Sequence, residues 1–470
     1  MIVRSRRVVL PDGVRPADIH VREGRITEIT AAPGAPGAPA APAPGAPGAP
    51  GAPGVPGEGE GTLDVGELIV LPGLVDTHVH VNEPGRTEWE GFETATRAAA
   101  AGGVTTIVDM PLNSVPPTTS LAGLEAKRRA AAGKCHVDVA FWGGVVPGNA
   151  GDLETLAHAG VRGFKCFLSS SGAYEFAPVD ERVLREAMPI LAHLGRPLLA
   201  HAEWPAALRA PQGDPRTYRT WLDSRPPEAE VAAIDRLVRL AREFGTRIHI
   251  VHLATGEALP LLRAARADGV NVTVETCPHY LTFAAADLRE GDTRFKCAPP
   301  IREGGERARL WDGLLAGDID LVATDHSPAP PAMKHMDDGD FVAAWGGIAS
   351  LQLGLSAVWT AAHLVYGDSP LSASGLSPYG ALARWLADAP ARLAGLTPRK
   401  GAIAPGADAD LVVWDPDADF VVDAASLYHR HPVTPYHGQR LRGRVRTTIL
   451  RGAVVFDDGQ CCGPALGRLL

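Results

Sequence analysis

The sequence predicts an α/β protein: a closed (β/α)₈ barrel, with a small β-sandwich formed by both chain ends. Between residues 71 and 395, short apolar runs alternate with segments of helical periodicity. This alternation is typical of parallel βαβ units, and eight such units are the number that closes a barrel. Near both termini, short β-branched runs bounded by Gly, Asp or Pro indicate the sandwich.

The elements follow one another in a regular order. Sandwich strands are expected at residues 2–10, 19–29 and 62–70 in the first portion (1–70), and at 410–414, 445–450 and 453–456 in the last (396–470). Barrel strands are expected at residues 73–80, 104–110, 137–143, 163–168, 197–201, 247–252, 272–276 and 319–325. Helices are expected at residues 89–101, 121–132, 153–159, 181–194, 228–244, 258–267 and 307–315. An open doubly wound sheet is the alternative, but no Gly-rich dinucleotide fingerprint follows the first barrel strand.

Composition narrows the class of protein. The 470 residues include 45 Lys and Arg against 54 Asp and Glu, a formal charge of -9, which disfavours nucleic acid or an anionic membrane as partner. No apolar stretch reaches membrane-spanning length, and the first residues turn polar too early for a secretory signal. Six Cys residues without a CxxC pair do not form a disulfide scaffold. We therefore expect a soluble, cytoplasmic protein that acts on a small molecule.

One segment differs in composition from the rest. Residues 31–57 consist almost entirely of Gly, Ala and Pro in repeats of three. The period is that of collagen, but the run is far too short for a triple helix. We expect a solvated loop within the sandwich that carries no chemistry.

Side chains able to bind metals fall at the ends of the predicted barrel strands. They are His78, His80, Lys165, His201, His252 and Asp325. Residues two apart in a strand point to the same face, and the C-terminal strand ends of a barrel meet at one mouth. An HxH pair or a Lys at the end of a strand is common without function. The prediction therefore depends on all six residues falling at the ends of barrel strands. His249 and His326 are weaker candidates for the site. His326 is a candidate for orienting a neighbouring residue of the site.

This residue set suits a pair of divalent cations. Neutral imidazoles and a carboxylate fit Zn²⁺ or a similar ion. Two adjacent cations repel, and an unmodified Lys165 would add a third positive charge. A carbamate formed from Lys165 and CO₂ would instead supply a bridging anion, and a hydroxide of lowered pKa would be the second bridge and the nucleophile. Cys166 and Cys297 are expected to be buried, inert thiols, and no G-x-S-x-G elbow supports a serine nucleophile.

Residues 72–80, PGLVDTHVH, resemble the opening motif of the cyclic-amidase branch of the amidohydrolase superfamily. That branch contains dihydroorotases, hydantoinases or dihydropyrimidinases, and allantoinases. The likeness covers nearly the whole chain, including GAIAPGADADL at 401–411. It implies one ion on His78, His80, Lys165 and Asp325 and a second on Lys165, His201 and His252. It also implies that Asp325 accepts and donates the proton, and that the protein is a homotetramer.

Within the branch, the loop NEPGRTEWEGF at 82–92 is most similar to the allantoinase group. The motifs at 109–114, 165–167, 296–302 and 325–328 are similar to that group as well. Asn82 stands where dihydroorotases carry an Arg that binds a substrate carboxylate, and Ser170 where hydantoinases usually carry a Tyr. The resemblance thus implies hydrolytic opening of allantoin, a neutral hydantoin with a ureido arm, to allantoate.

Asn82, Asn113 and Ser170 are candidate contacts to the ring or the ureido arm. Two alternatives stay open at this point. One is a hydantoinase or dihydropyrimidinase of the same fold. The other is a non-catalytic scaffold protein, a class that typically lacks the metal ligands present in this sequence.

Overall fold

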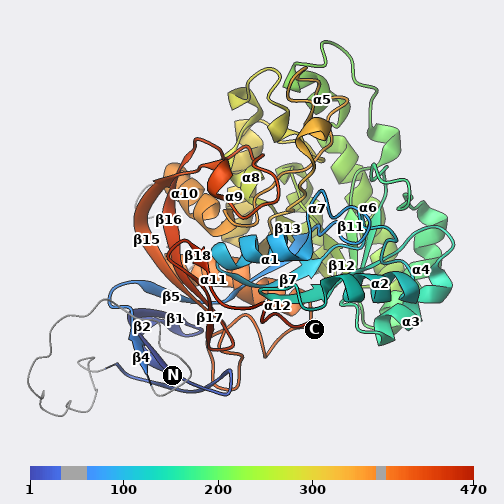
Figure 1. The fold of residues 1–470 in the computed structure, drawn as a ribbon. Helices are drawn as coiled ribbons and strands as arrows, with labels where there is room; N and C mark the ends of the chain where they lie inside the picture. Colours follow the sequence, from blue (N-terminus) through green and yellow to red (C-terminus); the bar gives the residue numbers. More distant parts are fainter. Residues whose placement is uncertain (33–60, 367–376) are drawn as a thin grey trace, which may run out of the picture.

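A computed structural model describes residues 1–32, 61–366 and 377–470 (Figure 1). The Gly/Ala/Pro-rich segment predicted as an inert loop therefore lies outside the described residues, apart from residues 31 and 32. None of the helices in the described ranges combines the length and apolarity needed to cross a bilayer.

The barrel strands form two parallel sheets that meet within the third predicted strand. The three-stranded sheet contains β6 (Leu74–Val79), β7 (Val104–Asp109) and β8 (Asp138–Phe141). The six-stranded sheet contains β9 (Gly143–Gly144), β10 (Phe164–Phe167), β11 (Leu198–His201), β12 (Ile248–Ile250), β13 (Val272–Thr276) and β14 (Leu321–Val322). Trp142 separates β8 from β9: its amide donates to Asp109 O, whereas the next amide, of Gly143, donates to Gly163 O. This one residue transfers the pairing from β7 to β10.

The ring closes between the last barrel strand and the first. Val79 and His326 form a parallel bridge, and His80 N donates to His326 O at 2.8 Å. His326 N in turn donates to His78 O at 3.2 Å. All eight predicted strands therefore lie in one parallel ring, and the (β/α)₈ prediction is confirmed over the open-sheet alternative.

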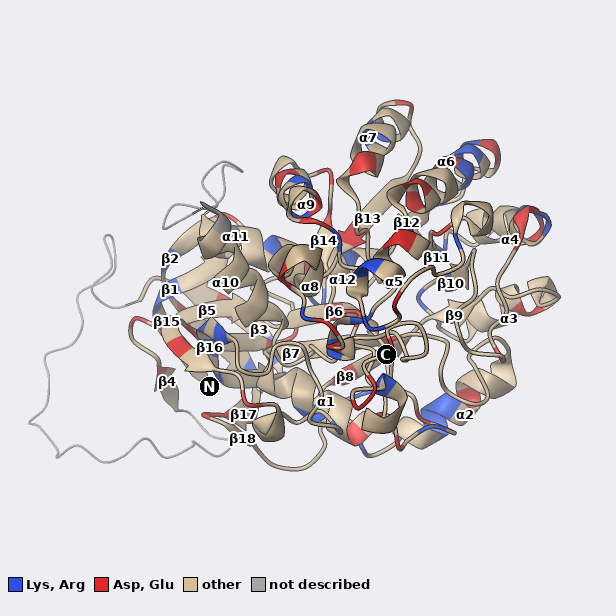
Figure 2. Cartoon of the chain, turned by 90° about the horizontal axis from the view of Figure 1, so that it is seen from above, with Lys and Arg blue, Asp and Glu red and all other residues tan. Residues whose placement is uncertain are grey.

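The predicted helices lie outside the ring, as Figure 2 shows for α4, α6, α7 and α9. They are α1 (Phe92–Ala101), α2 (Leu121–Ala131), α3 (Leu153–His158), α4 (Glu181–His193), α6 (Pro227–Phe244), α7 (Leu259–Ala267) and α9 (Gly304–Ala316). Capping sets their limits: Asp180 accepts from the Val183 amide at the start of α4, and α6 ends at Gly245 with φ 70°. The structure adds α5 (Tyr218–Ser224), α8 (Pro278–Thr282), α10 (Gly354–Tyr366), α11 (Pro378–Ala383) and α12 (Ala389–Leu393).

Strands from both chain ends share one nine-stranded sheet, in which the blue and red ends of the ribbon meet (Figure 1). Its order is β18-β17-β16-β15-β5-β1-β2-β3, with β4 paired to β1. The strands are β1 (Ile2–Leu10), β2 (Gly13–Arg22), β3 (Arg25–Thr30), β4 (Thr62–Asp64), β5 (Ile69–Pro72), β15 (Leu411–Val421), β16 (Arg440–Leu450), β17 (Ala453–Asp457) and β18 (Gln460–Cys461). The antiparallel β5–β15 pair joins the two ends, and Val3, Ile19 and Leu411 contribute to a separate small core. The boundaries 1–70, 71–395 and 396–470 stay a prediction.

The strand predicted at 19–29 is wrong as a single element. It comprises the end of β2 and most of β3, joined by a turn at Glu23 and Gly24 with φ of 52° and 75°. A two-residue turn with positive φ at both positions fits the twist of a hairpin. The β-branched pattern continues through this turn, so composition does not mark it. Residues 62–70 likewise divide into β4 and β5.

Lys400 ties the barrel to the terminal sheet through a buried cluster of charges. Its Nζ donates to Asp138 Oδ2 of β8 and to Asp410 Oδ2, each at 2.6 Å, and pairs with Asp408 at 3.1 Å. Arg451 also pairs with Asp138, and its amide donates to Asp410 Oδ1 at 2.8 Å. Burial lowers the pKa of Lys400, but Asp410 and Asp138 outweigh it and raise the pKa above its ordinary value. Arg399 also pairs with Asp408, so among the described residues Lys400 is the only cationic side chain paired with Asp410.

We expect Lys400→Met to lower the free energy of unfolding by about 3–5 kcal/mol, because it leaves the buried carboxylate of Asp410 without a cationic partner among the described residues. Chemical denaturation followed by circular dichroism measures this. The control is Arg392→Met, which removes an exposed pair with Asp388 and should cost less than about 1 kcal/mol. Equal losses in the two variants would contradict a special role for the buried cluster.

Candidate metal centre

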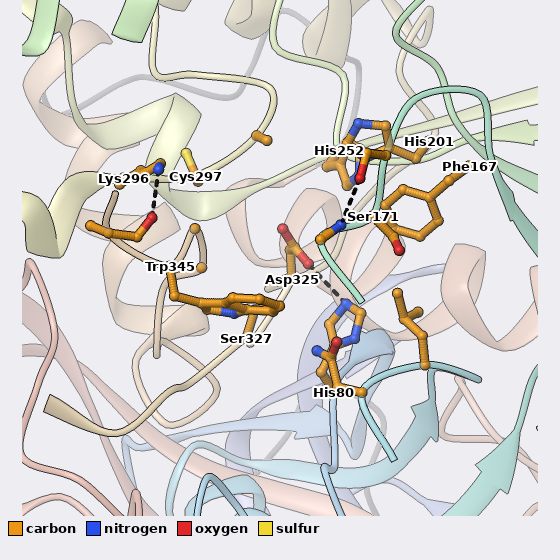
Figure 3. A pocket seen from close by; sticks show the side chains of 18 of the residues that line it. His80, Phe167, Ser171, His201, His252, Lys296, Cys297, Asp325, Ser327 and Trp345 are labelled. Atoms are coloured by element: carbon orange, nitrogen blue, oxygen red, sulfur yellow. Dashed lines mark hydrogen bonds and ion pairs between the residues drawn. The ribbon is translucent and has the colours of Figure 1, made fainter. Parts of the chain in front are cut away.

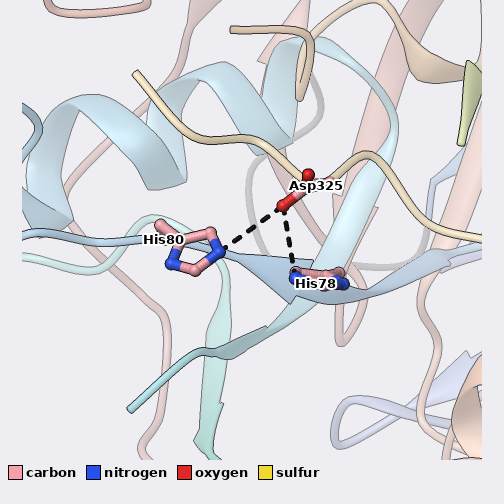
Figure 4. Close-up of side chains that lie close together, drawn as sticks. All are labelled: His78, His80 and Asp325. Carbon is pink, nitrogen blue, oxygen red and sulfur yellow. Dashed lines mark ion pairs between the residues drawn. The ribbon is translucent and has the colours of Figure 1, made fainter. Parts of the chain in front are cut away.

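The HxH motif and Asp325 form the first group of ligand-type side chains. His78 lies in β6, and His80 directly follows it. His78 Nε2 is 3.2 Å and His80 Nε2 is 3.4 Å from Asp325 Oδ1 (Figure 4). All three residues are buried, and their ligand atoms lie within 4.8 Å of one another. Two imidazoles and a carboxylate converge here, as three ligands of one cation do.

His201 and His252 form the second group. His201 ends β11, His252 follows β12, and their Nδ1 and Nε2 atoms are 3.0 Å apart. The ring centroids of His252 and His78 are 5.4 Å apart, so the two groups adjoin. Phe167 stacks on His201 with a centroid distance of 4.6 Å and fixes the plane of that ring.

Left-handed backbone conformations direct side chains into this site. His252 and Asp325 have φ of 39° and 47°, and Asn113 has φ of 70°. Such values are costly for residues other than Gly and persist where the surrounding structure imposes them. All three residues line the same cavity, which supports a functional role for the positions.

Lys165 lies in β10 with its amine buried beside the two groups. Within the described part of the chain its Nζ has no hydrogen-bond partner, and it is 5.1 Å from the centroid of the Phe167 ring. Burial lowers the pKa of Lys165 to about 8, although Glu275 and Asp325 act in the opposite direction. An amine in this environment is poorly stabilised as an ammonium.

Two further glutamates contact the ring nitrogens of His78 and His201 that face away from the site. Glu275 Oε1 contacts His78 Nδ1, and Glu203 Oε2 is 2.7 Å from His201 Nε2. When those nitrogens carry the proton, the lone pairs of His78 Nε2 and His201 Nδ1 face the site. The pKa of Glu275 lies below its ordinary value: burial raises it, but the charge of His78 and hydrogen bonds from His249 and His78 lower it more.

The protonation states match the requirements of a divalent cation. Burial lowers the pKa of His80 to about 4, and it holds the pKa of His201 and His252 below the ordinary value. Burial raises the pKa of Asp325, but His78 and His80 outweigh this and lower it to about 2. Neutral imidazoles and an ionised carboxylate at pH 7 are the forms that bind Zn²⁺-like ions, so the donor set fits a metal centre.

A cavity of about 280 Å³ opens above these residues (Figure 3). His78, His80, His201, His252 and Asp325 line it, whereas Lys165 lies buried outside the lining. Of the candidate substrate contacts, Asn113 and Ser170 are on the wall. Asn82 is not: it is fully buried, and its Nδ2 donates to Pro328 O at 3.4 Å.

Another part of the cavity lining was not predicted as a functional surface. Trp221, Arg225, Lys296 and Trp345 form much of it. Lys296 Nζ donates to Val342 O at 2.8 Å and to Ala344 O, and it lies 4.2 Å from the Trp221 ring centroid. The sequence pointed to this part of the lining only through the motif at 296–302. That motif resembles the allantoinase group, but none of its residues was assigned a role.

Several lesser predictions also have structural outcomes. Burial raises the pKa of Cys166 and of Cys297 to about 12, which agrees with inert thiols. His249 Nε2 is 3.0 Å from Glu275 Oε2, and this buried histidine does not line the cavity. His326 Nδ1 accepts from Ser350 N at 3.1 Å and so supports the loop that follows Asp325.

The sequence pattern of the amidohydrolase family matches residues 69–455, most of the chain. The chain belongs to the amidohydrolase family. Membership implies a divalent metal centre and a hydrolytic enzyme, and His78, His80 and Asp325 are residues of this chain able to hold an ion.

Relatives within the amidohydrolase family are similar over most of their length. An allantoinase of Streptomyces avermitilis is 48% identical, with 100% of this chain and 98% of the relative covered. An allantoinase of Saccharomyces cerevisiae is 46% identical over 84% of each chain. Among solved structures, the L-hydantoinase (dihydropyrimidinase) of Arthrobacter aurescens has a TM-score of 0.87 and 30% identity, with 100% of this chain and 99% of that chain covered.

We expect His78→Ala and His80→Ala to abolish most divalent metal binding, because each removes an imidazole from the group around Asp325. Elemental analysis of the purified variants measures the metal per subunit. His158→Ala, at an exposed position on α3, is the control and should keep the wild-type content. Wild-type metal content in both HxH variants would remove these residues from the ligand set.

Proposed function

We propose that this protein hydrolyses the ring amide of allantoin to give allantoate. The observation that carries this proposal is the 48% identity to an allantoinase over the whole chain, against 30% to a hydantoinase of the same fold. Asn82 and Ser170 support the proposal as well. Asn82 stands where dihydroorotases carry a carboxylate-binding Arg, and Ser170 stands where hydantoinases usually carry a Tyr. The cavity of about 280 Å³ suits a small polar ring.

Two divalent ions, taken here as Zn²⁺, would occupy the centre. His78, His80, Lys165 and Asp325 would hold one ion, and Lys165, His201 and His252 the other. Such ions supply a water of lowered pKa and polarise the scissile carbonyl. The amine of Lys165 is buried and has no hydrogen-bond partner among the described residues, which supports its conversion to a carbamate, in which neutral amine and CO₂ combine with release of one proton.

Asp325 would accept and return the proton of the reaction. Its carboxylate lies in the cavity wall beside His78 and His80, where an attacking water and the ring amide would meet. It takes the proton from the water and then delivers it to the departing ring nitrogen, so one group serves as base and acid. Asn113 and Ser170 would contact the ring or ureido arm, whereas Asn82 would act from outside the cavity by holding Pro328.

The assembly and location are proposed on the family resemblance and the composition. A homotetramer is the expected state, which light scattering coupled to size-exclusion chromatography measures. A cytoplasmic location agrees with the lack of a membrane-crossing helix in the described ranges.

We expect turnover of allantoin to exceed that of hydantoin and dihydrouracil under identical conditions. The reason is that Ser170 replaces the usual hydantoinase Tyr and that the cavity lining includes polar side chains, among them Asn113 and Ser170, that can contact a ureido arm. Ring opening of all three compounds is followed on one preparation with its metal content quantified. Faster opening of either unsubstituted ring would overturn the assignment in favour of a hydantoinase or dihydropyrimidinase.

We expect Asp325→Asn to lower kcat by about 10²–10⁴-fold, because an amide cannot accept the proton of water. KM should change much less, since the substitution keeps the shape of the wall. Saturation kinetics with allantoin separate the two parameters. Asp287→Asn, at an exposed position, is the control. A variant with wild-type kcat would exclude Asp325 as the proton acceptor.

We expect Lys165→Ala to be inactive and to regain part of its turnover in millimolar acetate or propionate, whose carboxylate replaces the carbamate. Turnover against acid concentration measures the rescue. The control is Lys296→Ala, whose lost amine donates to two carbonyls and is not replaced by an acid. Equal response of the two variants would argue against a bridging carbamate.

A further inference from the structure

We propose that Glu275 is the positioning residue that orients ligands in both halves of the metal centre. Glu275 lies in β13, is fully buried, and is not among the residues that line the cavity. It therefore does not reach the substrate and acts through its neighbours. The inference rests on the proposed function, because it presupposes ions held by the histidines.

The Glu275 carboxylate joins three segments of the barrel. Its Oε1 contacts His78 Nδ1 of β6 and accepts from the His252 amide at 3.2 Å. Its Oε2 is 3.0 Å from His249 Nε2 of β12, and His249 Nδ1 lies 2.8 Å from Thr273 Oγ1. Both carboxylate oxygens are thus engaged, and the group has one orientation.

These contacts act on the two ligand groups by different routes. In the first group, the contact with His78 Nδ1 keeps the proton on that atom and leaves Nε2 toward Asp325 as a stronger donor. In the second group, the bond to the His252 amide holds a residue with φ of 39°, and so aims its ring at His201. Loss of Glu275 should therefore weaken both groups together.

Glu203 offers a matched comparison, because it contacts only one group. Its Oε2 accepts from His201 Nε2 and from Arg225. The Arg225 guanidinium lies over the Trp221 ring, with its Cζ 4.7 Å from the ring centroid. In the described structure no bond links Glu203 to His78 or His80. Loss of Glu203 should weaken the second ion alone.

The test titrates metal-free full-length protein with Zn²⁺ and measures metal per subunit and dissociation constants. Glu275→Gln keeps the size and one acceptor but removes the charge, and we expect it to weaken both ions by about 10- to 100-fold. Glu203→Gln should weaken one ion. Glu306→Gln, which alters a buried carboxylate bonded to the Gly256 amide away from the cavity, should leave both ions unchanged.

Kinetics provide a second readout. Added Zn²⁺ should restore kcat of Glu275→Gln toward the wild-type value with unchanged KM, because substrate contacts are intact. Thermal unfolding of each variant shows that the fold is preserved.

The outcomes separate this inference from the proposed function. Two ions bound with wild-type affinity in folded Glu275→Gln would overturn the inference and leave the proposed function standing. Loss of only one ion would overturn the claim that Glu275 acts on both groups. Equally weakened Zn²⁺ binding in Glu306→Gln would show that loss of any buried carboxylate has this effect, and would overturn the inference. Folded wild-type protein without affinity for Zn²⁺ or other divalent ions would overturn the proposed function itself.

Discussion

The site depends on the burial of several bases around an amine that has no hydrogen-bond partner within the described residues. Water does not stabilise charge there, so burial shifts the pKa of each unpaired base toward its neutral form. Burial lowers the pKa of His80 to about 4 and that of Lys165 to about 8, while Asp325 stays ionised beside its two histidines. Uncharged donors, one carboxylate and a low-pKa amine form an environment that favours cations and an added anion. The chemistry of the centre follows from this constraint.

Barrel closure brings these groups to one place. Residues 78–80 meet residues 325–326 only because β6 and the segment after β14 complete the ring, with His326 bonded to the main chain of both His78 and His80. On the opposite end of the strands, Lys400 anchors β8 to the terminal sheet through Asp138 and Asp410. The candidate metal ligands lie at the mouth and this buried charge cluster lies at the base, a division typical of this fold.

The overall fold and the walls of the cavity differ in what they indicate about function. The fold is shared with hydantoinases, as the TM-score of 0.87 at 30% identity shows. The walls come from connecting segments that contain Ser170, Lys296 and Trp345, and similarity to allantoinases is higher when the whole sequence is compared. Function on a common fold is decided by such segments. The scaffold alternative lacks support, because the chain retains every ligand-type side chain at the strand ends.

The sequence by itself determined the eight barrel strands and the positions of the histidines at their ends, because strand formation follows local periodicity and one face of a strand repeats every second residue. It did not reveal the hairpin turn at Glu23, where the local pattern continues unchanged. Tertiary structure alone decided that Asn82 is buried outside the cavity and bonded to Pro328 O. It also decided that Glu275, an ordinary strand residue in sequence, contacts His78 almost 200 positions away. Such meetings depend on the register around a closed ring, which no local pattern encodes.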